Sequence, residues 1–352
     1  MKTIDRSKPV MLTGATGYVA GWLVKKLLEA GLTVHAAVRD PDNTDKIAHL
    51  EELATHSSGN INYFKSDLLQ EGSYARAMSG CELVFHTASP FISHVKNPKK
   101  ELVEPAKLGT QNVLEQANET KSVKRVVLTS SCAAIYGDNS ELEETPDGVF
   151  SEQNWNTTSS LEHQPYSYSK TIAERKAWEI CQNQERWDLG VINPCMVMGP
   201  ALNPRTTSSE SINILKGLGD GTLKFGAPDI GFGVVDVRDV AEAHYQAAFT
   251  PEAQGRYITC GHNSSLLEMA QILHARYGEH YPIPKKALPK WLLMLIGPMV
   301  NKTMTRKYIH KNVNLPFKTN NSKSREELGV TYRPLEETME EAFQVLIDNN
   351  II

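Results

Sequence analysis

The sequence lacks the features that mark several classes of protein. Its 352 residues include only five cysteines, an odd number, scattered without a CxxC pair or any other metal-ligand spacing. We therefore expect free thiols in a reducing compartment, no disulfide and no metal site. Lys and Arg number 37 against 41 Asp and Glu, so the formal net charge of -4 gives no reason to expect nucleic acid or an anionic membrane as a partner.

Long hydrophobic runs are also absent. The most apolar stretch, WLLMLIGPMV, has about half of the roughly 20 residues that span a membrane, and it predicts a buried or surface-docking helix. The polar N-terminus, MKTIDRSKPV, does not resemble a secretory signal. No internal repeat or low-complexity segment is present. These observations favour a soluble cytoplasmic protein, a monomer or homodimer, whose partner is a small molecule.

The chain instead alternates short apolar runs with helical patterns. An apolar run at Val10–Leu12 precedes two glycines, after which Val19, Leu23 and Leu27 recur at helical spacing until Gly31. Further apolar runs follow in LTVHAAVRDP, ELVFHTAS, KRVVLTSS and LGVINP. Repeated βα units of this kind predict an α/β fold with a doubly wound parallel sheet.

Gly14, Gly17 and Ala20 form a GxxGxxA pattern between the first strand and the first helix. Such a pattern leaves room for bare backbone where a pyrophosphate meets a helix N-terminus. Gly14 allows the tight turn, and Gly17 allows the close approach of the ligand. A turn that merely joins a strand to a helix is the alternative interpretation, but the sequence around it favours dinucleotide binding.

The end of the second strand distinguishes the two nicotinamide cofactors. A carboxylate there accepts hydrogen bonds from the ribose of NAD, whereas a cation pairs with the 2′-phosphate of NADP. In VRDPDNTDK, Arg39 follows the strand directly and Lys46 lies one to two helical turns further on. These cations predict NADPH as the cofactor. The alternative is that Arg39 is an ordinary solvated surface residue, and the neighbouring Asp40 is the observation that favours this alternative.

The regular alternation ends at about Pro194. Turns, prolines and amphipathic helices follow, although GVVDVRDVAEAHYQAAF and GRYITC still have the pattern of core elements. We therefore predict a dinucleotide-binding domain of residues 1–194 and 234–260, and a smaller, mixed α/β substrate lobe of residues 195–233 and 261–352. Because ligands bind at the carboxyl ends of strands in such sheets, the lobe is expected to close over the site.

The stretch QPYSYSKTIAERKAW places Tyr166 and Lys170 one turn apart on one helix face. A phenol has an unperturbed pKa near 10, and a nearby ammonium stabilises the phenolate, so Tyr166 can act as a general acid and base. The same spacing occurs in Tyr281 and Lys285, where prolines exclude a helix, so spacing alone is weak evidence. Tyr168 points off this face and is expected to pack or to line a pocket.

A hydroxyl cluster in KRVVLTSSCAAIYG ends a buried strand shortly before that helix. We predict that Ser131 hydrogen-bonds the substrate oxygen, although a serine at a strand end is often only a turn residue. With Tyr166 and Lys170 it suits reduction of a carbonyl, in which hydride passes from nicotinamide to carbon while Tyr166 protonates oxygen. A protein that senses dinucleotide without turnover would not need all three. Cys132 and Cys195 either line this site or pack in the core.

Taken together, these motifs resemble the extended short-chain dehydrogenases/reductases, and among them the dihydroflavonol reductases, cinnamoyl-CoA reductases and yeast-type aldehyde and methylglyoxal reductases. The resemblance covers nearly the whole chain and is carried by TGATGYVAGWLVKKLLEAG, VRDPDNTDK, SDL, VFHTASP, TSSCAA, PYSYSKTIAERKAW and INPCMVMGP. It implies a Rossmann domain, NADPH, and reduction of aldehydes or ketones to alcohols. A nucleotide-sugar epimerase or dehydratase that uses NAD is the alternative on the same fold.

The resemblance also implies roles for individual residues. Asn112 is similar to the helix asparagine that supports the catalytic lysine through water in this superfamily. Lys170 is implied to bind the nicotinamide ribose as well. Further cofactor contacts are implied for Thr16, Tyr18 and Val19 in the glycine turn, Asp67 and Leu68 at the adenine, Thr87, Ala88 and Ser89 at the middle of the cofactor, Pro194 and Val197 at the nicotinamide, and Ser208.

Two departures from the family patterns bear on the substrate. QPYSYSK replaces the NWYCYGK of cinnamoyl-CoA reductases, and Tyr136 stands where dihydroflavonol reductases favour asparagine. Between Met196 and Gly233 the cations are spread out, with no cluster to match phosphates. We therefore expect a small, uncharged and apolar carbonyl substrate. The candidates for its pocket wall, which also suit an ordinary core, are Phe91, Ile92, Tyr136, Met196 and Phe232.

Overall fold

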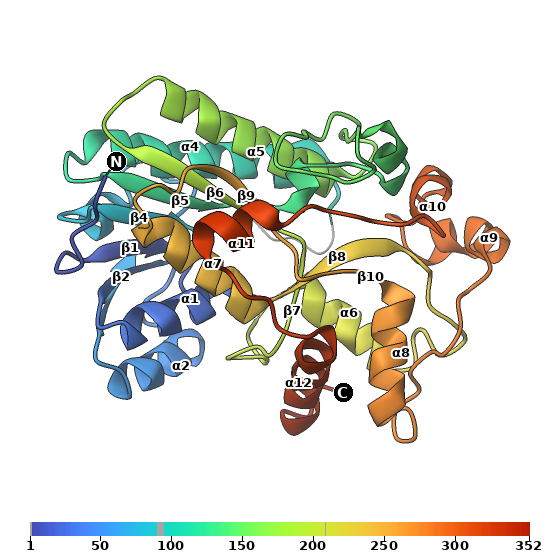
Figure 1. Cartoon of the computed structure of the whole chain (residues 1–352). Helices are drawn as coiled ribbons and strands as arrows, with labels where there is room; N and C mark the ends of the chain where they lie inside the picture. The colour runs from blue at the N-terminus through green and yellow to red at the C-terminus, as the bar shows by residue number, and fades with distance from the viewer. Residues whose placement is uncertain (1, 90–94, 208) are drawn as a thin grey trace.

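The structure, a computed structural model, describes residues 2–89, 95–207 and 209–352. Its main feature is a parallel sheet of seven strands in the order β3-β2-β1-β4-β5-β6-β9 (Figure 1). The strands are β1 (Val10–Thr13), β2 (Thr33–Val38), β3 (Asn60–Lys65), β4 (Leu83–His86), β5 (Arg125–Thr129), β6 (Asp188–Pro194) and β9 (Gly255–Thr259). The order reverses between β1 and β4, which is where dinucleotides bind in open sheets. The predicted doubly wound parallel sheet is confirmed.

Helices cover both faces of this sheet, which is why its central strands β1 and β4 are buried along their whole length. On one face α1 (Tyr18–Glu29) packs against α7 (Val237–Phe249), and on the other α4 (Glu104–Glu119) packs against α5 (Pro165–Gln182). Two separate apolar cores fill the two interfaces. The smaller elements of this part are α2 (Thr44–Thr55), α3 (Ala75–Met78), the π-helix η1 (Lys99–Val103), the 3-10 helices η2 (Cys132–Ala134) and η3 (Asn139–Glu144), and α11 (Ser322–Leu328).

A second, smaller sheet lies beside the carboxyl ends of the main strands. Here β8 (Gly231–Asp236) pairs in parallel with β7 (Met196–Met198) and antiparallel with β10 (His262–Ser265). Its helices are α6 (Glu210–Gly219), α8 (Leu266–Tyr277), α9 (Lys290–Val300), α10 (Arg306–Asn312) and α12 (Leu335–Asp348). A mixed α/β lobe was expected and is confirmed, whereas the domain boundaries stay a prediction. The strand β8 crosses the predicted boundary at 233/234.

The apolar stretch WLLMLIGPMV lies in α9. This helix and α10 stand at the end of the molecule farthest from β1 and β2 (Figure 1). Leu293 and Gly297 are buried, while Trp291 is exposed, so the helix lies on the surface with one side covered. Across the described ranges, every helix is too short or too polar to cross a membrane. All five cysteines lie in those ranges and are free thiols.

Candidate active site

The glycine turn joins β1 to α1 at the switch point of the sheet. Gly14 has φ +67°, which favours glycine, and a Cβ there would lie 3.1 Å from the Cα of Ala88, a tight contact that would push on that backbone. Gly17 occupies the N-cap position of α1, and its amide donates to the carbonyl of Gly14 at 2.9 Å. Gly17 is exposed, and Thr16 and Val19 are half-buried. The turn therefore presents a helix N-terminus to solvent, as pyrophosphate binding requires.

Thr13 locks the ends of β1 and β4 together. Its hydroxyl oxygen accepts hydrogen bonds from the amides of Thr87 at 3.1 Å and Ala88 at 3.0 Å. The hydroxyl hydrogen is then left to donate to Nδ1 of His86, 3.0 Å away. Burial lowers the pKa of His86 to about 3, so this imidazole is neutral. Sequence reasoning identified Thr87 and Ala88 but missed Thr13 and His86.

The predicted cations lie at the carboxyl end of β2. Arg39 follows β2, Lys46 lies in the first turn of α2, and both are exposed. Burial is the main cause that raises the pKa of Tyr74; Asp67 adds to the rise and Arg39 opposes it, so both charges lie near that phenol. Asp40 accepts a hydrogen bond from the amide of residue 42 at 3.2 Å, within its own loop. Arg39 and Asp67 thus both act electrostatically on the same phenol.

Asn112 and Lys170 have different partners. The side-chain amide of Asn112 donates to the carbonyl of Leu68 at 3.0 Å, on the predicted adenine side. The ammonium of Lys170 donates to the hydroxyl of Ser89 at 3.0 Å. Beside Lys170 is a polar cavity of about 20 Å³, room for one water molecule, and its lining includes Thr110 but not Asn112. Sequence reasoning did not identify Thr110, which precedes Asn112 by two residues.

Tyr166 and Lys170 lie one turn apart on α5, as their spacing predicted. The ammonium of Lys170 is 5.8 Å from the centroid of the Tyr166 ring. Tyr166 is 47% exposed, whereas Lys170 is only 9% exposed. The tyrosine is therefore open to a ligand, and the lysine beneath it is held in place.

Ser131 follows β5 and forms the N-cap of η2. Its hydroxyl oxygen accepts a hydrogen bond from the amide of Ala133 at 3.1 Å, so its hydrogen remains free to donate elsewhere. The helix α5 packs against η2, and the hydroxyl of Thr171, which donates to the carbonyl of Ser167 at 2.9 Å, lies 3.5 Å from the carbonyl oxygen of Ala133. Ser131 is thus fixed at the strand end next to the helix that carries Tyr166.

A buried polar network supports Ser131 from below. Glu174 of α5 accepts hydrogen bonds from Ser130 at 2.5 Å and from the amide of Asn193 at 2.7 Å. Its other oxygen lies 2.6 Å from Nε of Arg256 on β9. Asn193 also donates to the carbonyl of Ser131 at 3.2 Å. These groups hold the backbone around Ser131, and no local sequence pattern identifies them.

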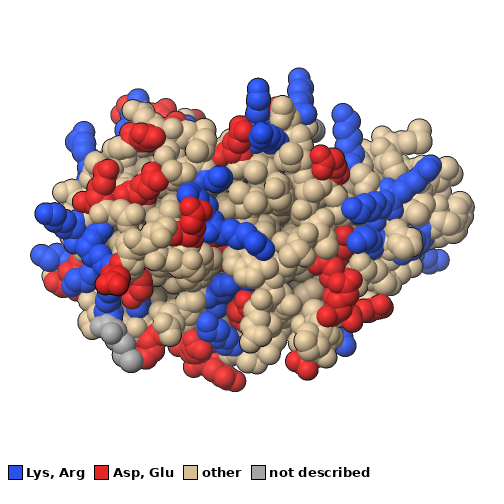
Figure 2. Space-filling view, turned by 90° about the horizontal axis from the view of Figure 1, so that it is seen from above, with Lys and Arg blue, Asp and Glu red and all other residues tan. Residues whose placement is uncertain are grey.

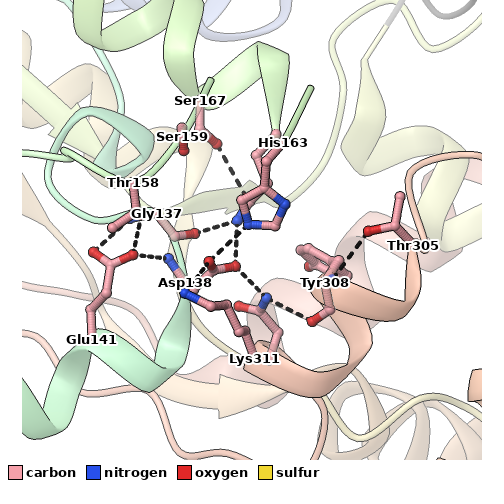
Figure 3. A network of polar contacts seen from close by, with 12 residues as sticks. Gly137, Asp138, Glu141, Thr158, Ser159, His163, Ser167, Thr305, Tyr308 and Lys311 are labelled. Carbon is pink, nitrogen blue, oxygen red and sulfur yellow. Dashed lines mark hydrogen bonds and ion pairs between the residues drawn. The ribbon is translucent and has the colours of Figure 1, made fainter. Parts of the chain in front are cut away.

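A second network holds the entry to α5 (Figure 3). The carboxylate of Asp138 lies 2.8 Å from Nε2 of His163 and accepts a hydrogen bond from Gln164 at 2.8 Å. Asn312 of α10 donates to the same carboxylate at 2.7 Å, and Lys311 lies 3.5 Å from it. Gln164 has φ +54°, a left-handed conformation that is costly for a residue with a side chain. The network thus fixes the backbone two residues before Tyr166.

The predicted nicotinamide segment lies between the two sheets. Pro194 ends β6, and Val197 lies in β7 opposite Val235. The hydroxyl of Tyr18, at the start of α1, donates to the carbonyl of Gly199 at 2.6 Å. This bond ties the glycine turn to the segment after β7. The predicted contact Ser208 lies outside the described residues.

The pocket-wall candidates lie in different surroundings. Tyr136 stacks with Phe150, at 4.7 Å between ring centroids, and burial raises its pKa well above the ordinary value. Met196 and Phe232 are half-buried in the small sheet. Phe91 and Ile92 lie outside the described residues. Cys132 and Cys195 are buried, with their sulfur atoms 3.0 Å apart.

Comparison with known proteins identifies relatives over the whole chain. Residues 10–261 match the model of the NAD dependent epimerase/dehydratase family. Cinnamoyl-CoA reductase CAD2 of Medicago truncatula is 35% identical over 98% of both chains. Anthocyanidin reductase of Arabidopsis thaliana is 37% identical over 78% of this chain and 82% of its own. Gre2 of Candida albicans, solved in complex with NADPH, is 25% identical with a TM-score of 0.76, over 97% of this chain and 98% of its own.

Proposed function

Because the chain belongs to the NAD dependent epimerase/dehydratase family, we propose that it is an NADPH-dependent reductase of aldehydes or ketones. The observation that carries this proposal is the position of Lys170. Its ammonium reaches from α5 to Ser89 after β4 and lies 5.8 Å from the ring of Tyr166. A fixed cation between the strand ends and an open tyrosine suits proton transfer to a carbonyl oxygen at the switch point.

The residues present fit NADPH. The turn at Gly14 and Gly17 has a left-handed backbone at its first glycine and exposes the N-terminus of α1, which suits a pyrophosphate. Exposed Arg39 and Lys46 are the groups to hold the 2′-phosphate, since both lie after β2. The relative Gre2 of Candida albicans was solved with NADPH, which supports the same assignment. Lys170 would hold the nicotinamide ribose.

When bound, NADPH supplies the hydride that reduces the carbonyl carbon. The hydroxyl of Ser131 binds the carbonyl oxygen, because its own oxygen already accepts from Ala133 and only its hydrogen is free. Tyr166 gives its proton to the same oxygen, and the ammonium of Lys170 stabilises the phenolate that is left. Glu174 and Asn193 keep Ser131 in position through the strand-end backbone.

The substrate is proposed to be small, uncharged and apolar. Arg205 and Lys224 are exposed and Lys216 is half-buried on α6, so the segment from 196 to 233 offers no focused cation site for a nucleotide or CoA phosphate. Met196 and Phe232 offer apolar surface instead. We place the enzyme in a reducing, cytoplasmic compartment, because its cysteines are free thiols. An epimerase or dehydratase with NAD is disfavoured by the cations after β2.

The direct test uses the purified chain with saturating NADPH and an aldehyde series from acetaldehyde through hexanal to cinnamaldehyde. We expect one NADPH oxidised per alcohol formed, and kcat/KM that rises with the apolar tail because tail burial stabilises the complex. A kcat/KM that stays constant along the series, or turnover of cinnamoyl-CoA alone, would overturn the proposal of an apolar substrate. If no carbonyl compound leads to oxidation of NADPH, the proposed reductase activity itself is wrong.

A further inference from the structure

Charge is unevenly distributed along the chain. Residues 280–325 contain ten Lys and Arg and no Asp or Glu, so the remaining residues hold 27 Lys and Arg against all 41 Asp and Glu. This segment supplies α9, α10 and the turns around them. The net charge of -4 therefore conceals a strongly basic region, and Figure 2 shows basic side chains gathered at the right-hand end of the molecule.

The same end carries exposed apolar side chains. Trp291, Leu295 and Met299 follow one another at intervals of four on α9, and they are 69%, 58% and 84% exposed. Val300 ends the helix at 79% exposure. Phe225, which is 84% exposed, lies in a turn whose chain pairs with the segment leading into α9. We call these five residues the α9 surface.

The opposite side of α9 is firmly packed. Leu293 contributes to a small buried core shared with Ile309 of α10. A Cβ on Gly297 would lie 3.0 Å from Cδ1 of Ile309, so the two helices cross closely. The ammonium of Lys290 donates to the carbonyls of His310 at 3.0 Å and Val313 at 2.8 Å. Because the packed side is already satisfied, the α9 surface faces outward in the folded chain.

Cations flank both ends of α9. In the part of the chain that the structure describes, the carboxylate pairs of the basic segment are made by Lys311, with Asp138, and Lys323, with Glu327. The cations nearest α9 are exposed and belong to neither pair: Lys285, Lys286, Lys302, Arg306 and Lys307.

We propose that the α9 surface docks on anionic lipid membranes. Exposed apolar side chains would enter the headgroup boundary, and the flanking cations would contact the anionic headgroups. Trp291, at the start of the helix, has the amphipathic ring that favours this interface. Eleven residues are too few to span a bilayer, so α9 lies in the membrane plane. A second copy of the chain is a poor occupant, because the two basic segments would repel one another.

The first test is co-sedimentation of the full chain with vesicles of phosphatidylcholine, with or without phosphatidylserine. We expect binding to be at least about tenfold tighter with phosphatidylserine and to weaken as salt rises. Leu295→Ser is expected to weaken binding at least about fivefold, whereas Leu108→Ser, which replaces a leucine 48% exposed on α4, leaves it unchanged. Likewise, the double variant Lys302→Glu/Lys307→Glu is expected to weaken binding, whereas the control variant Lys121→Glu is expected to leave it unchanged.

The second test locates the contact. Quenching of tryptophan fluorescence by brominated lipids is expected for the native chain, and it is largely lost in Trp291→Phe, which still sediments with vesicles. Equal binding to neutral and anionic vesicles, or binding unchanged in Leu295→Ser, overturns the proposal. So does tighter binding to soluble poly-glutamate than to vesicles, which indicates an acidic protein partner. If the chain forms a dimer without lipid and Leu295→Ser dissociates that dimer, the α9 surface is an interface with a second copy and the proposal is overturned. Melting curves confirm that each variant folds.

Discussion

The ammonium of Lys170 donates to the hydroxyl oxygen of Ser89, across the space between α5 and the end of β4, at 3.0 Å. Lys170→Met removes the cation beside Tyr166, so we expect turnover to fall at least about 100-fold. Ser89→Ala removes only the neutral partner, and water from the adjacent cavity can replace it, so turnover stays within about tenfold. Steady-state kinetics on both variants check this. Similar losses in both would show that Lys170 acts only through Ser89.

The cofactor assignment depends on Arg39, which is exposed at the end of β2. Arg39→Ala removes a charged hydrogen-bond donor for the 2′-phosphate, which is worth about 1.5–3 kcal/mol, or roughly ten- to 150-fold in affinity for NADPH. NADH has no phosphate there, so its binding serves as the control and is expected to stay nearly constant. Titration calorimetry measures both. Equal weakening of the two cofactors would contradict the assignment.

Because of His86, the free energy of unfolding is expected to decrease as the pH is lowered. Its folded pKa is about 3, whereas an unfolded histidine titrates near 6.5, so the unfolded state binds the extra proton first. The contribution is fully present above pH 6.5 and is lost as pH falls toward 3; about 2 kcal/mol is lost by pH 5. Urea unfolding of the native chain and of His86→Asn measures it. The variant is expected to show the shallower dependence on pH, and identical slopes would contradict the prediction.

The ion pair between Glu174 and Arg256 is expected to be a stability determinant. Glu174→Leu removes the buried carboxylate that faces Nε of Arg256 and that accepts hydrogen bonds from Ser130 and Asn193, and breaking a buried pair in this way typically costs about 3–5 kcal/mol. Glu179→Ala, on the same helix, removes an exposed carboxylate from its pair with the partly buried Lys176 and costs less than about 1 kcal/mol. Urea unfolding compares the two variants. A loss for Glu174→Leu no larger than for Glu179→Ala would contradict the prediction.

The sequence predicts those parts of the molecule in which local pattern and position agree. The apolar runs and the glycine turn predict the parallel sheet, because each βα unit must bury both faces of its strand. Tyr166 and Lys170 share a face of α5 because four residues complete about one turn. By contrast, β10 has the polar sequence HNSS and forms only because β8 lies opposite, so periodicity does not predict it.

The supporting residues escape sequence reasoning for a related reason. Glu174 and Arg256 are 82 positions apart, and Asp138 meets Lys311 and Asn312 only after the lobe has folded onto the sheet. Their roles come from burial and from contacts between distant segments, which no short motif encodes. For Asn112 the structure gives a direct contact that the sequence did not predict, since its amide donates to the carbonyl of Leu68, and its support of Lys170 through water stays a prediction.

We propose above all that Tyr166 is the proton donor for a carbonyl held beside NADPH. Tyr166→Phe removes the hydroxyl with little change of volume, and Tyr168→Phe, on the same helix, is the matched control. Single-turnover oxidation of bound NADPH by hexanal, followed by absorbance, measures the reaction directly. We expect a rate at least about 100-fold lower in Tyr166→Phe, with unchanged affinity for NADPH, and a nearly native rate in Tyr168→Phe. A native rate in Tyr166→Phe, or the loss in Tyr168→Phe instead, would contradict it.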